Sequence, residues 1–259
     1  MRILFVGDVV GQPGRKALAE QLPKLRSQYR FNICVVNAEN AAGGIGLTRK
    51  VAEELFALGA DVLTMGNHVW DKKEIFDFID TEERIVRPLN YPGPCPGRGC
   101  GAFPVPGTSA MLGVVNLSGR VFSPTHFDCP FRAAEQAVEE LQDCHGILID
   151  IHGEATSEKM ALGWYLDGRV SAVVGTHTHV QTADNRVLPG GTAFISDVGM
   201  TGPLDSVIGI RKELVLERFL TQRPVKFELA KGRTCLSAVL IEVNMETRLA
   251  HSIERILLK

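Results

Sequence analysis

The sequence has 259 residues with 28 basic and 30 acidic side chains, which gives a formal net charge of −2. Hydrophobic residues account for 45% and charged residues for 22%, values of a folded globular protein that exclude an intrinsically disordered chain. The near-neutral balance excludes a globally basic surface for binding nucleic-acid backbones, so any attraction for phosphate must be local.

No part of the sequence has the pattern of a targeting signal or a membrane span. The first apolar run covers residues 3–7 and ends at Asp8, far short of a secretory signal. No apolar stretch approaches the ~18 residues of a transmembrane helix. The six cysteines are scattered, which favours reduced thiols. We therefore expect a soluble, cytoplasmic protein with no membrane partner.

Short apolar runs alternate with helical patterns, a rhythm that predicts parallel strand–helix–strand units and an α/β fold. In chain order, the predicted elements are a strand at 3–6, a helix at 13–30, a strand at 33–36, a helix at 49–58, a strand at 62–65, a helix at 71–78, a strand at 111–117, a helix at 130–141, a strand at 147–151, a helix at 158–166, and strands at 170–174, 192–196, 235–243 and 249–257.

Three further expectations concern how these elements are joined. Pro23 should kink or interrupt the first helix, and the last two strands should pair as a hairpin. Residues 87–107, dense in proline and glycine, should form a loop rather than a domain linker, because the same pattern continues beyond them. The length allows one domain or two, and the unbroken pattern favours one domain over residues 1–259.

Polar side chains directly follow five of the predicted strands. These residues are Asp8, Glu39, Asn40, Asn67, His68, His152, His177 and His179. Each one alone would be interpreted as a turn former, a helix cap or a satisfied structural group. In an open α/β sheet, however, ligand sites form at the carboxyl ends of the strands. Five strand ends with oxygen or imidazole groups therefore indicate one shared site.

The residue types in this set favour divalent metal ions. Carboxylate, carboxamide oxygen and imidazole are first-row metal ligands, and no thiolate accompanies them, which argues against a structural zinc site. If extended, His177 and His179 would leave the same face of the chain. Seven candidate ligands are more than one ion needs, so we expect two ions with Glu39 as the bridge.

Charge counting favours a phosphate ligand at such a pair of ions. Two divalent ions bring +4, Asp8 and Glu39 subtract two, and a bridging hydroxide subtracts one, which leaves about +1. The centre would attract a phosphodiester and lower the pKa of bound water from 15.7 toward ~7.

Four stretches resemble the ordered motifs of the calcineurin-like metallophosphoesterases and, more closely, those of the YmdB-like phosphodiesterases. They are residues 7–11 (GDVVG), 37–44 (NAENAAGG), 66–70 (GNHVW) and 175–179 (GTHTH). The resemblance covers essentially the whole chain. It implies a four-layer α/β/β/α sandwich, two ions of iron or manganese (with zinc as a further candidate), and hydrolysis of 2′,3′-cyclic nucleotides.

The resemblance also implies a role for each residue of the set. Asp8, Asn40 and His179 would hold one ion, Asn67, His152 and His177 the other, and Glu39 would lie between them. A metal-bridging hydroxide would attack phosphorus, and His68 would donate the proton to the leaving group. Val10 stands where the wider superfamily has a histidine, and Glu39 where it has an aspartate; both departures fit the YmdB-like branch.

Alternative functions remain open at this point. A phosphomonoesterase acting on nucleotides or phosphoproteins would use the same site. A regulatory metal-binding protein with little turnover is a third interpretation, because Val10 cannot bind metal. The expected partner is a small phosphodiester such as a cyclic nucleotide. Further candidates are RNA ends as substrates and a second copy of the chain in a homo-oligomer. Three further groups could contact the substrate. Residues 43–46 would otherwise form a simple turn, His126 would lie in a solvated loop, and Trp70 would pack in the core.

Overall fold

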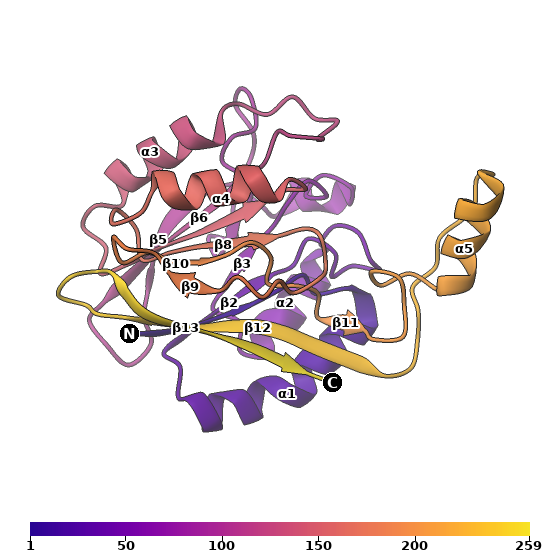
Figure 1. The fold of residues 1–259 in the computed structure, drawn as a ribbon, viewed down its shortest axis with the longest axis horizontal. Helices are drawn as coiled ribbons and strands as arrows, with labels where there is room; N and C mark the ends of the chain where they lie inside the picture. The colour runs from indigo at the N-terminus through magenta and orange to yellow at the C-terminus, as the bar shows by residue number, and fades with distance from the viewer.

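The structure, a computed structural model, describes residues 1–259 and contains two β-sheets that lie between helices (Figure 1). The first sheet has the order β11–β12–β1–β2–β3–β4, and β13 pairs with β12. Its strands are β1 (Arg2–Val6), β2 (Ile33–Asn37), β3 (Val62–Thr64), β4 (Ile85–Val86), β11 (Gly202–Pro203), β12 (Thr234–Val243) and β13 (Ala250–Leu258). Strands β1 to β4 are parallel, whereas β12 runs antiparallel to β1 and forms the predicted hairpin with β13.

The second sheet has the order β5–β6–β7–β8–β10–β9. Its strands are β5 (Cys100–Pro104), β6 (Met111–Ser118), β7 (Ile147–His152), β8 (Ala172–Thr176), β9 (Arg186–Val187) and β10 (Ala193–Ile195). The four central strands are parallel, and the two edge strands are antiparallel to their neighbours. Each sheet therefore has a parallel core, whose strands all end at one edge.

Helices cover the outer faces of both sheets. The helices are α1 (Gly11–Tyr29), α2 (Arg49–Ala57), α3 (Pro130–Glu140), α4 (Thr156–Tyr165) and α5 (Lys212–Thr221). Helices α1 and α2 lie on the first sheet, and α3 and α4 lie on the second (Figure 1). The predicted four-layer α/β/β/α sandwich is thus confirmed.

The alternation of side chains along the strands builds this sandwich. On β1, Leu4 and Val6 pack toward α1 and α2, whereas Ile3 and Phe5 pack between the two sheets. On β8, Val173 faces the other helical layer. Three hydrophobic clusters of 28, 21 and 16 buried residues fill the gaps between the four layers. The central strands are buried on both faces, which is why they appear in the sequence as continuous apolar runs.

Several predicted elements differ from the structure. Residues 73–77 form a short 3₁₀ helix, η1 (Lys73–Asp77), instead of an α-helix over 71–78. The predicted loop at 87–107 contains β5, an edge strand whose residues alternate between buried and exposed. Helix α5 was not predicted, because only Val215 on it is buried and no apolar stripe marks it in the sequence.

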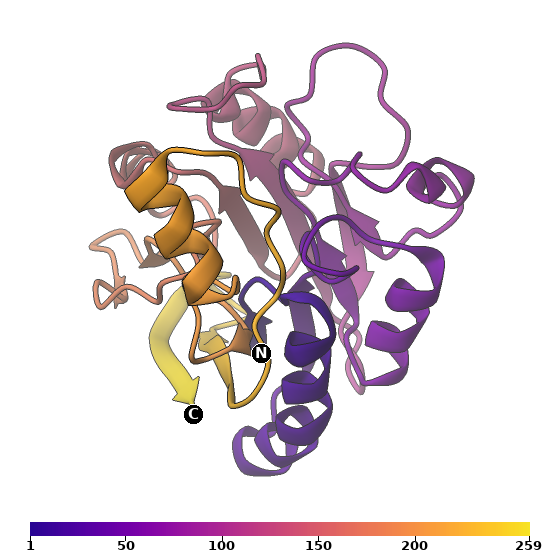
Figure 2. The ribbon, with the colours of Figure 1, turned by 90° about the vertical axis from the view of Figure 1, so that its right-hand side faces the viewer.

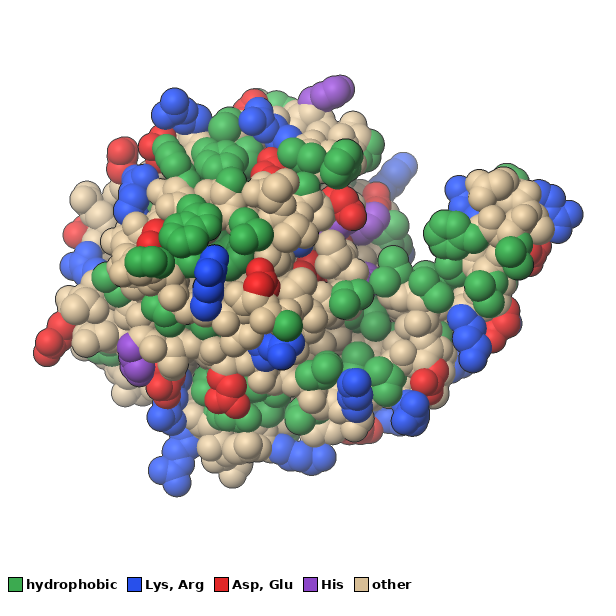
Figure 3. Space-filling view, viewed as in Figure 1, with side chains coloured by type: hydrophobic (Ala, Val, Ile, Leu, Met, Phe, Trp, Pro, Cys, Tyr) green, Lys and Arg blue, Asp and Glu red, His purple; other side chains and the backbone are tan.

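Helix α5 stands away from the sandwich on a long connection between β11 and β12 (Figures 1 and 2). Its apolar side chains are largely exposed, with Phe219 at 72% and Leu220 at 82% of their full surface. Figure 3 shows hydrophobic side chains on the projecting arm. No helix in the protein is both long enough and apolar enough for a bilayer crossing, and all six cysteines are free.

The expectation that Pro23 interrupts the first helix is wrong. Helix α1 continues through Pro23 to Tyr29. Pro23 is exposed, whereas its neighbours Leu22 and Leu25 are buried against the first sheet. Packing of this apolar face therefore outweighs the hydrogen bond that a proline cannot donate.

Replacing Pro23 by alanine should stabilise the protein, because alanine restores a backbone donor at an exposed helix position. We expect the free energy of unfolding to rise by about 1–2 kcal/mol, the gain in helix propensity being partly offset by a more flexible unfolded chain. Urea unfolding followed by circular dichroism measures the change. Lys24→Ala, at the next exposed position, serves as the control and should change stability little. A less stable Pro23→Ala protein would contradict this explanation.

Candidate functional site

The polar residues predicted from the five strand ends lie together at one edge of the two sheets. Asp8 follows β1, Glu39 and Asn40 follow β2, Asn67 and His68 follow β3, His152 ends β7, and His177 and His179 follow β8. The backbone N–H of His177 donates to Asp8 Oδ2 over 3.2 Å, although the two residues are 169 positions apart. The site is therefore built from both sheets.

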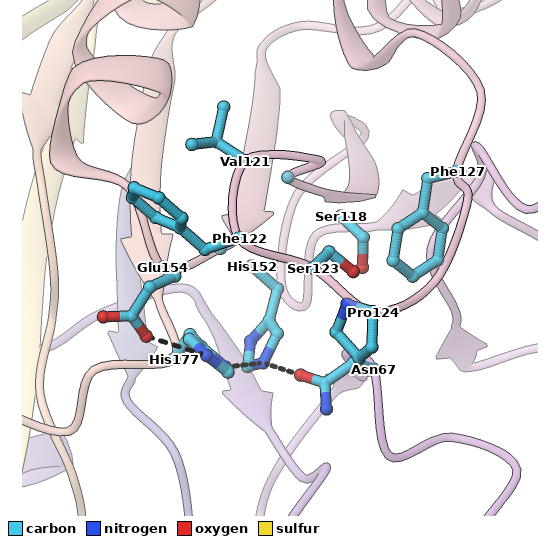
Figure 4. Close-up of a pocket in the computed structure, with 12 residues that line it drawn as sticks. Asn67, Ser118, Val121, Phe122, Ser123, Pro124, Phe127, His152, Glu154 and His177 are labelled. Atoms are coloured by element: carbon cyan, nitrogen blue, oxygen red, sulfur yellow. Dashed lines mark hydrogen bonds and ion pairs between the residues drawn. The ribbon is translucent and has the colours of Figure 1, made fainter.

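The first group of contacts surrounds the ring of His152. Its Nε2 lies 3.1 Å from Asn67 Oδ1 and 2.9 Å from His177 Nδ1 (Figure 4). The same nitrogen lies 3.1 Å from Glu39 Oε2. We call Glu39, Asn67, His152 and His177 the His152 cluster. One ring nitrogen carries at most one proton, so Nε2 cannot serve three neighbours as a hydrogen-bond donor.

The opposite side of the ring indicates where the proton of His152 lies. Thr176 Oγ1 is 2.8 Å from His152 Nδ1 and 2.7 Å from Asp150 Oδ1. Asp150 is buried and also accepts hydrogen bonds from Thr64 and Asn37, as a carboxylate does. The Thr176 hydroxyl therefore donates to Asp150 and accepts from His152 Nδ1. This arrangement favours a proton on Nδ1.

His177 and His179 have left-handed backbone conformations, with φ angles of 107° and 66°. The expectation of an extended segment with both rings on one face is therefore wrong. The chain turns directly after β8, and the two rings enter different groups of contacts. His177 Nε2 lies 3.3 Å from Glu154 Oε2, so its Nδ1 is the nitrogen that faces His152.

We call Asp8, Asn40 and His179 the His179 cluster, because Asn40 contacts His179 directly and the charge of His179 acts on Asp8. His179 Nε2 lies 3.2 Å from Asn40 Oδ1. His179 Nδ1–H donates to the carbonyl oxygen of Ile208, and the Asn40 amide donates to the carbonyl oxygen of Gly44. Two lone pairs therefore face each other here. Asp8 Oδ1 is buried and has no hydrogen-bond partner.

Both carboxylates of the site are buried. Burial raises the pKa of Asp8 above its ordinary value, because water no longer solvates the charged form. Burial acts in the same direction on Glu39, but His152 overcomes it and holds the pKa of Glu39 below its ordinary value. Burial would lower the pKa of His152, yet Glu39 raises it, whereas burial and His152 lower the pKa of His177. Two buried carboxylates make added positive charge favourable here.

These donor atoms fit divalent transition-metal ions. Glu39, His152 and His177 offer ligand atoms that all lie within 4.8 Å of one another. The His179 cluster adds a buried oxygen without a partner. Carboxylate, amide oxygen and neutral imidazole are ligands that suit iron, manganese and zinc. Gly66 leaves the space that the site needs, because a Cβ atom there would lie 2.1 Å from Glu39 Oε2.

His68 lies beside this site, and its ring points to a different partner. Its backbone N–H donates to Glu39 Oε2 over 3.3 Å, and its Nδ1 lies 2.6 Å from Asp71 Oδ2. Asp71 was not recognised in the sequence, although it follows His68 by three residues on the same turn. The contact leaves His68 Nε2 available for proton transfer.

A buried ion pair supports the turn that carries His177 and His179. Lys159 Nζ lies 3.0 Å from Asp197 Oδ2, and both side chains are 1% exposed. The same carboxylate oxygen accepts the backbone N–H of Thr178 over 2.9 Å. Lys159 was not recognised in the sequence. A lysine on an otherwise helical pattern gives no sign of burial.

The structure favours the structural interpretations of three weaker signals. The backbone N–H groups of Gly43 and Gly44 bond to carbonyls within their own turn, so they are not free to cradle an anion. Trp70 stacks on Phe76 with ring centroids 5.1 Å apart. His126 is exposed and does not line the cavity beside the His152 cluster.

Comparisons with known proteins agree with this geometry. Residues 4–256 match the family model described as YmdB-like protein. A curated relative from Bacillus subtilis (strain 168), named 2′,3′-cyclic-nucleotide 2′-phosphodiesterase, is 54% identical over 259 residues, which cover 100% of this chain and 97% of the relative.

Two crystal structures share the whole fold. A hypothetical protein from Thermus thermophilus superimposes with a TM-score of 0.93 at 43% identity and covers 99% of this chain and 98% of its own. A Mycoplasma pneumoniae protein described as a novel phosphatase has a TM-score of 0.93 at 35% identity, covering 100% and 93%. The chain belongs to the YmdB-like family, the branch of the calcineurin-like metallophosphoesterases that its motifs predict.

Proposed function

We propose that the protein is a metal-dependent phosphodiesterase that hydrolyses small nucleotide phosphodiesters, with 2′,3′-cyclic nucleotides as preferred substrates. The observation that carries the proposal is the convergence of carboxylate, amide and imidazole groups from five strand ends on two neighbouring groups of contacts. The activity named for the Bacillus subtilis relative supports the substrate class. The seven candidate ligands are divided between the two sheets, so neither sheet forms the site alone. This division supports residues 1–259 acting as one domain.

Two divalent ions would be held by the two clusters. Asp8, Asn40 and His179 would bind one ion, Asn67, His152 and His177 would bind the other, and Glu39 would bridge them. The donor set favours iron or manganese, with zinc as a third candidate. When bound, such ions supply a nucleophile from water at neutral pH and neutralise charge on the phosphoryl group.

His68 would supply the proton for the leaving group. In the hydrolysis, the oxygen of one water forms a bond to phosphorus, the bond from phosphorus to one ribose oxygen breaks, and that oxygen takes up a proton. A ribose alkoxide is a poor leaving group, so the proton donor matters for the rate. Asp71, which bonds Nδ1 of His68, would fix the ring with Nε2 toward the departing oxygen.

The alternatives from the sequence differ in substrate or in turnover. A phosphomonoesterase is favoured by one observation, the description of the Mycoplasma pneumoniae structure as a phosphatase. A regulatory protein with little turnover would keep the metal ions but show almost no hydrolysis. Two further expectations stay predictions: RNA ends as substrates and a homo-oligomeric state.

A substrate panel separates these functions. We expect the manganese-loaded protein to hydrolyse adenosine 2′,3′-cyclic phosphate faster than adenosine 3′,5′-cyclic phosphate and an aryl phosphate monoester. Initial rates on the three substrates, with a short RNA ending in a 2′,3′-cyclic phosphate as a fourth, give the comparison. A preference for the monoester would favour the phosphomonoesterase. Absence of hydrolysis in protein that holds its metals would favour the regulatory protein.

Asn67→Ala should remove one ion while leaving the other, because Asn67 supplies a ligand to the His152 cluster only. Metal analysis of purified protein should give about one equivalent fewer per chain than the parent. Asn32→Ala is the matched control, since Asn32 bonds Arg2 at the opposite end of the first sheet. Retention of two equivalents by Asn67→Ala would exclude Asn67 as a ligand.

His68→Ala should keep both metal ions and lose most of the turnover. We expect kcat to fall about 10²–10⁴-fold, which is the usual contribution of a general acid. Asp71→Asn should lose less, because it leaves the proton donor in place. Metal content measured on the same samples separates loss of chemistry from loss of ions. An unchanged kcat in metal-replete His68→Ala would remove His68 from the mechanism.

A further inference from the structure

A cavity that is partly open to solvent lies beside the His152 cluster. One wall is formed by Asn67, His152 and His177, and the opposite wall by residues 118–127, called here the pocket loop (Figure 4). A molecule whose phosphate lies at the His152 cluster must therefore place its other atoms against the pocket loop.

Phe122 is the unusual residue of this loop. It lines the cavity, yet 84% of its surface is exposed. Its φ angle is 63°, in a turn that the hydrogen bond from Ser123 N–H to the carbonyl of Arg120 closes. Glycine or asparagine is favoured at such a position. An exposed phenylalanine there does not help folding, so its ring is available for a ligand.

The turn that carries Phe122 is fixed to the site. The buried Glu158 carboxylate accepts the backbone N–H groups of Arg120 and Val121 over 3.0 and 3.1 Å. The N–H of Gly119 donates to the carbonyl oxygen of His152 over 2.9 Å. The ring of Phe122 is thus held at the rim of a cavity whose floor is the His152 cluster.

Ser118 gives a second, independent sign of a ligand. Its side chain is buried and lines the same cavity, and its Oγ has no hydrogen-bond partner. Buried hydroxyl groups are nearly always hydrogen-bonded, so an unpaired one calls for a partner. An aromatic wall with one unpaired polar group is a pattern typical of small-molecule sites.

On the basis of the proposed function, we propose that this cavity is the nucleoside subsite. Phe122 stacks on the base of the substrate, and the Ser118 hydroxyl, which can donate or accept, hydrogen-bonds a polar group of the base. Every base has a π-face, so the stacking accepts all four bases. The subsite therefore selects nucleotides over phosphodiesters that lack a base, without selecting one base.

The test compares two substrates that share the reacting group. One is adenosine 2′,3′-cyclic phosphate, and the other is 1-O-methylribose 2,3-cyclic phosphate, which has no base. We expect Phe122→Ala to lower kcat/KM for the nucleotide about ten- to a hundredfold, the usual effect of one stacked base, and to leave the abasic substrate unchanged. Phe122→Tyr should retain the preference, and Phe122→Leu should lose it.

Two further variants complete the test. Ser118→Ala should raise KM for the nucleotide and not for the abasic substrate. Phe219→Ala is the matched control, because Phe219 is 72% exposed on α5 and lines no part of this cavity. Equal losses on both substrates, or none, in Phe122→Ala would overturn the subsite.

A binding measurement separates this proposal from the proposed function. Adenosine 3′-monophosphate is titrated by calorimetry into the parent protein and into Phe122→Ala. If the parent hydrolyses neither substrate but binds the nucleotide through Phe122, the proposed function fails and the subsite stands. If hydrolysis is normal but nucleotide affinity is the same in both proteins, the subsite fails and the proposed function stands.

Discussion

The constraint on which this structure depends is the burial of two carboxylates beside imidazole and amide groups, an arrangement that favours positive charge at the site. His152 Nε2 lies 3.1 Å from Asn67 Oδ1 and 3.1 Å from Glu39 Oε2, and Thr176 Oγ1 contacts the other ring nitrogen of His152. Asp8 Oδ1 lies buried without a partner in the adjoining group. Such an arrangement costs free energy in an empty protein and becomes favourable when positive charge enters. The surrounding fold must therefore be rigid enough to keep the atoms together.

The layered architecture supplies that rigidity. Parallel strands of two sheets end at a common edge, and each central strand is buried on both faces, so the site residues start from backbone that cannot shift easily. The remaining strain is local. His177 and His179 occupy backbone conformations that side chains rarely adopt, and the turn between them is held by the buried pair of Lys159 and Asp197. Strained ligand positions held by a well-packed surrounding are common at functional sites.

Much of this could be predicted from the sequence, because buried parallel strands appear as short apolar runs and the polar residue after each run marks the strand end. The order of motifs then identified the family and its layers. What the sequence did not reveal depends on tertiary contacts. Helix α5 has no apolar stripe, since it packs on little, and β5 is a half-exposed edge strand among prolines and glycines. The turn at His177 depends on hydrogen bonds from the backbone N–H groups of His177 and Thr178 to the side chains of Asp8 and Asp197. These acceptors are 169 and 19 residues away in the sequence, so no local pattern encodes the turn.

Anomalous diffraction from crystals grown with manganese tests the central claim most directly. We expect two peaks, one among Asn67, His152 and His177 and one among Asp8, Asn40 and His179, with Glu39 adjacent to both. Peaks elsewhere, or ordered density for water alone between these side chains at saturating manganese, would contradict it.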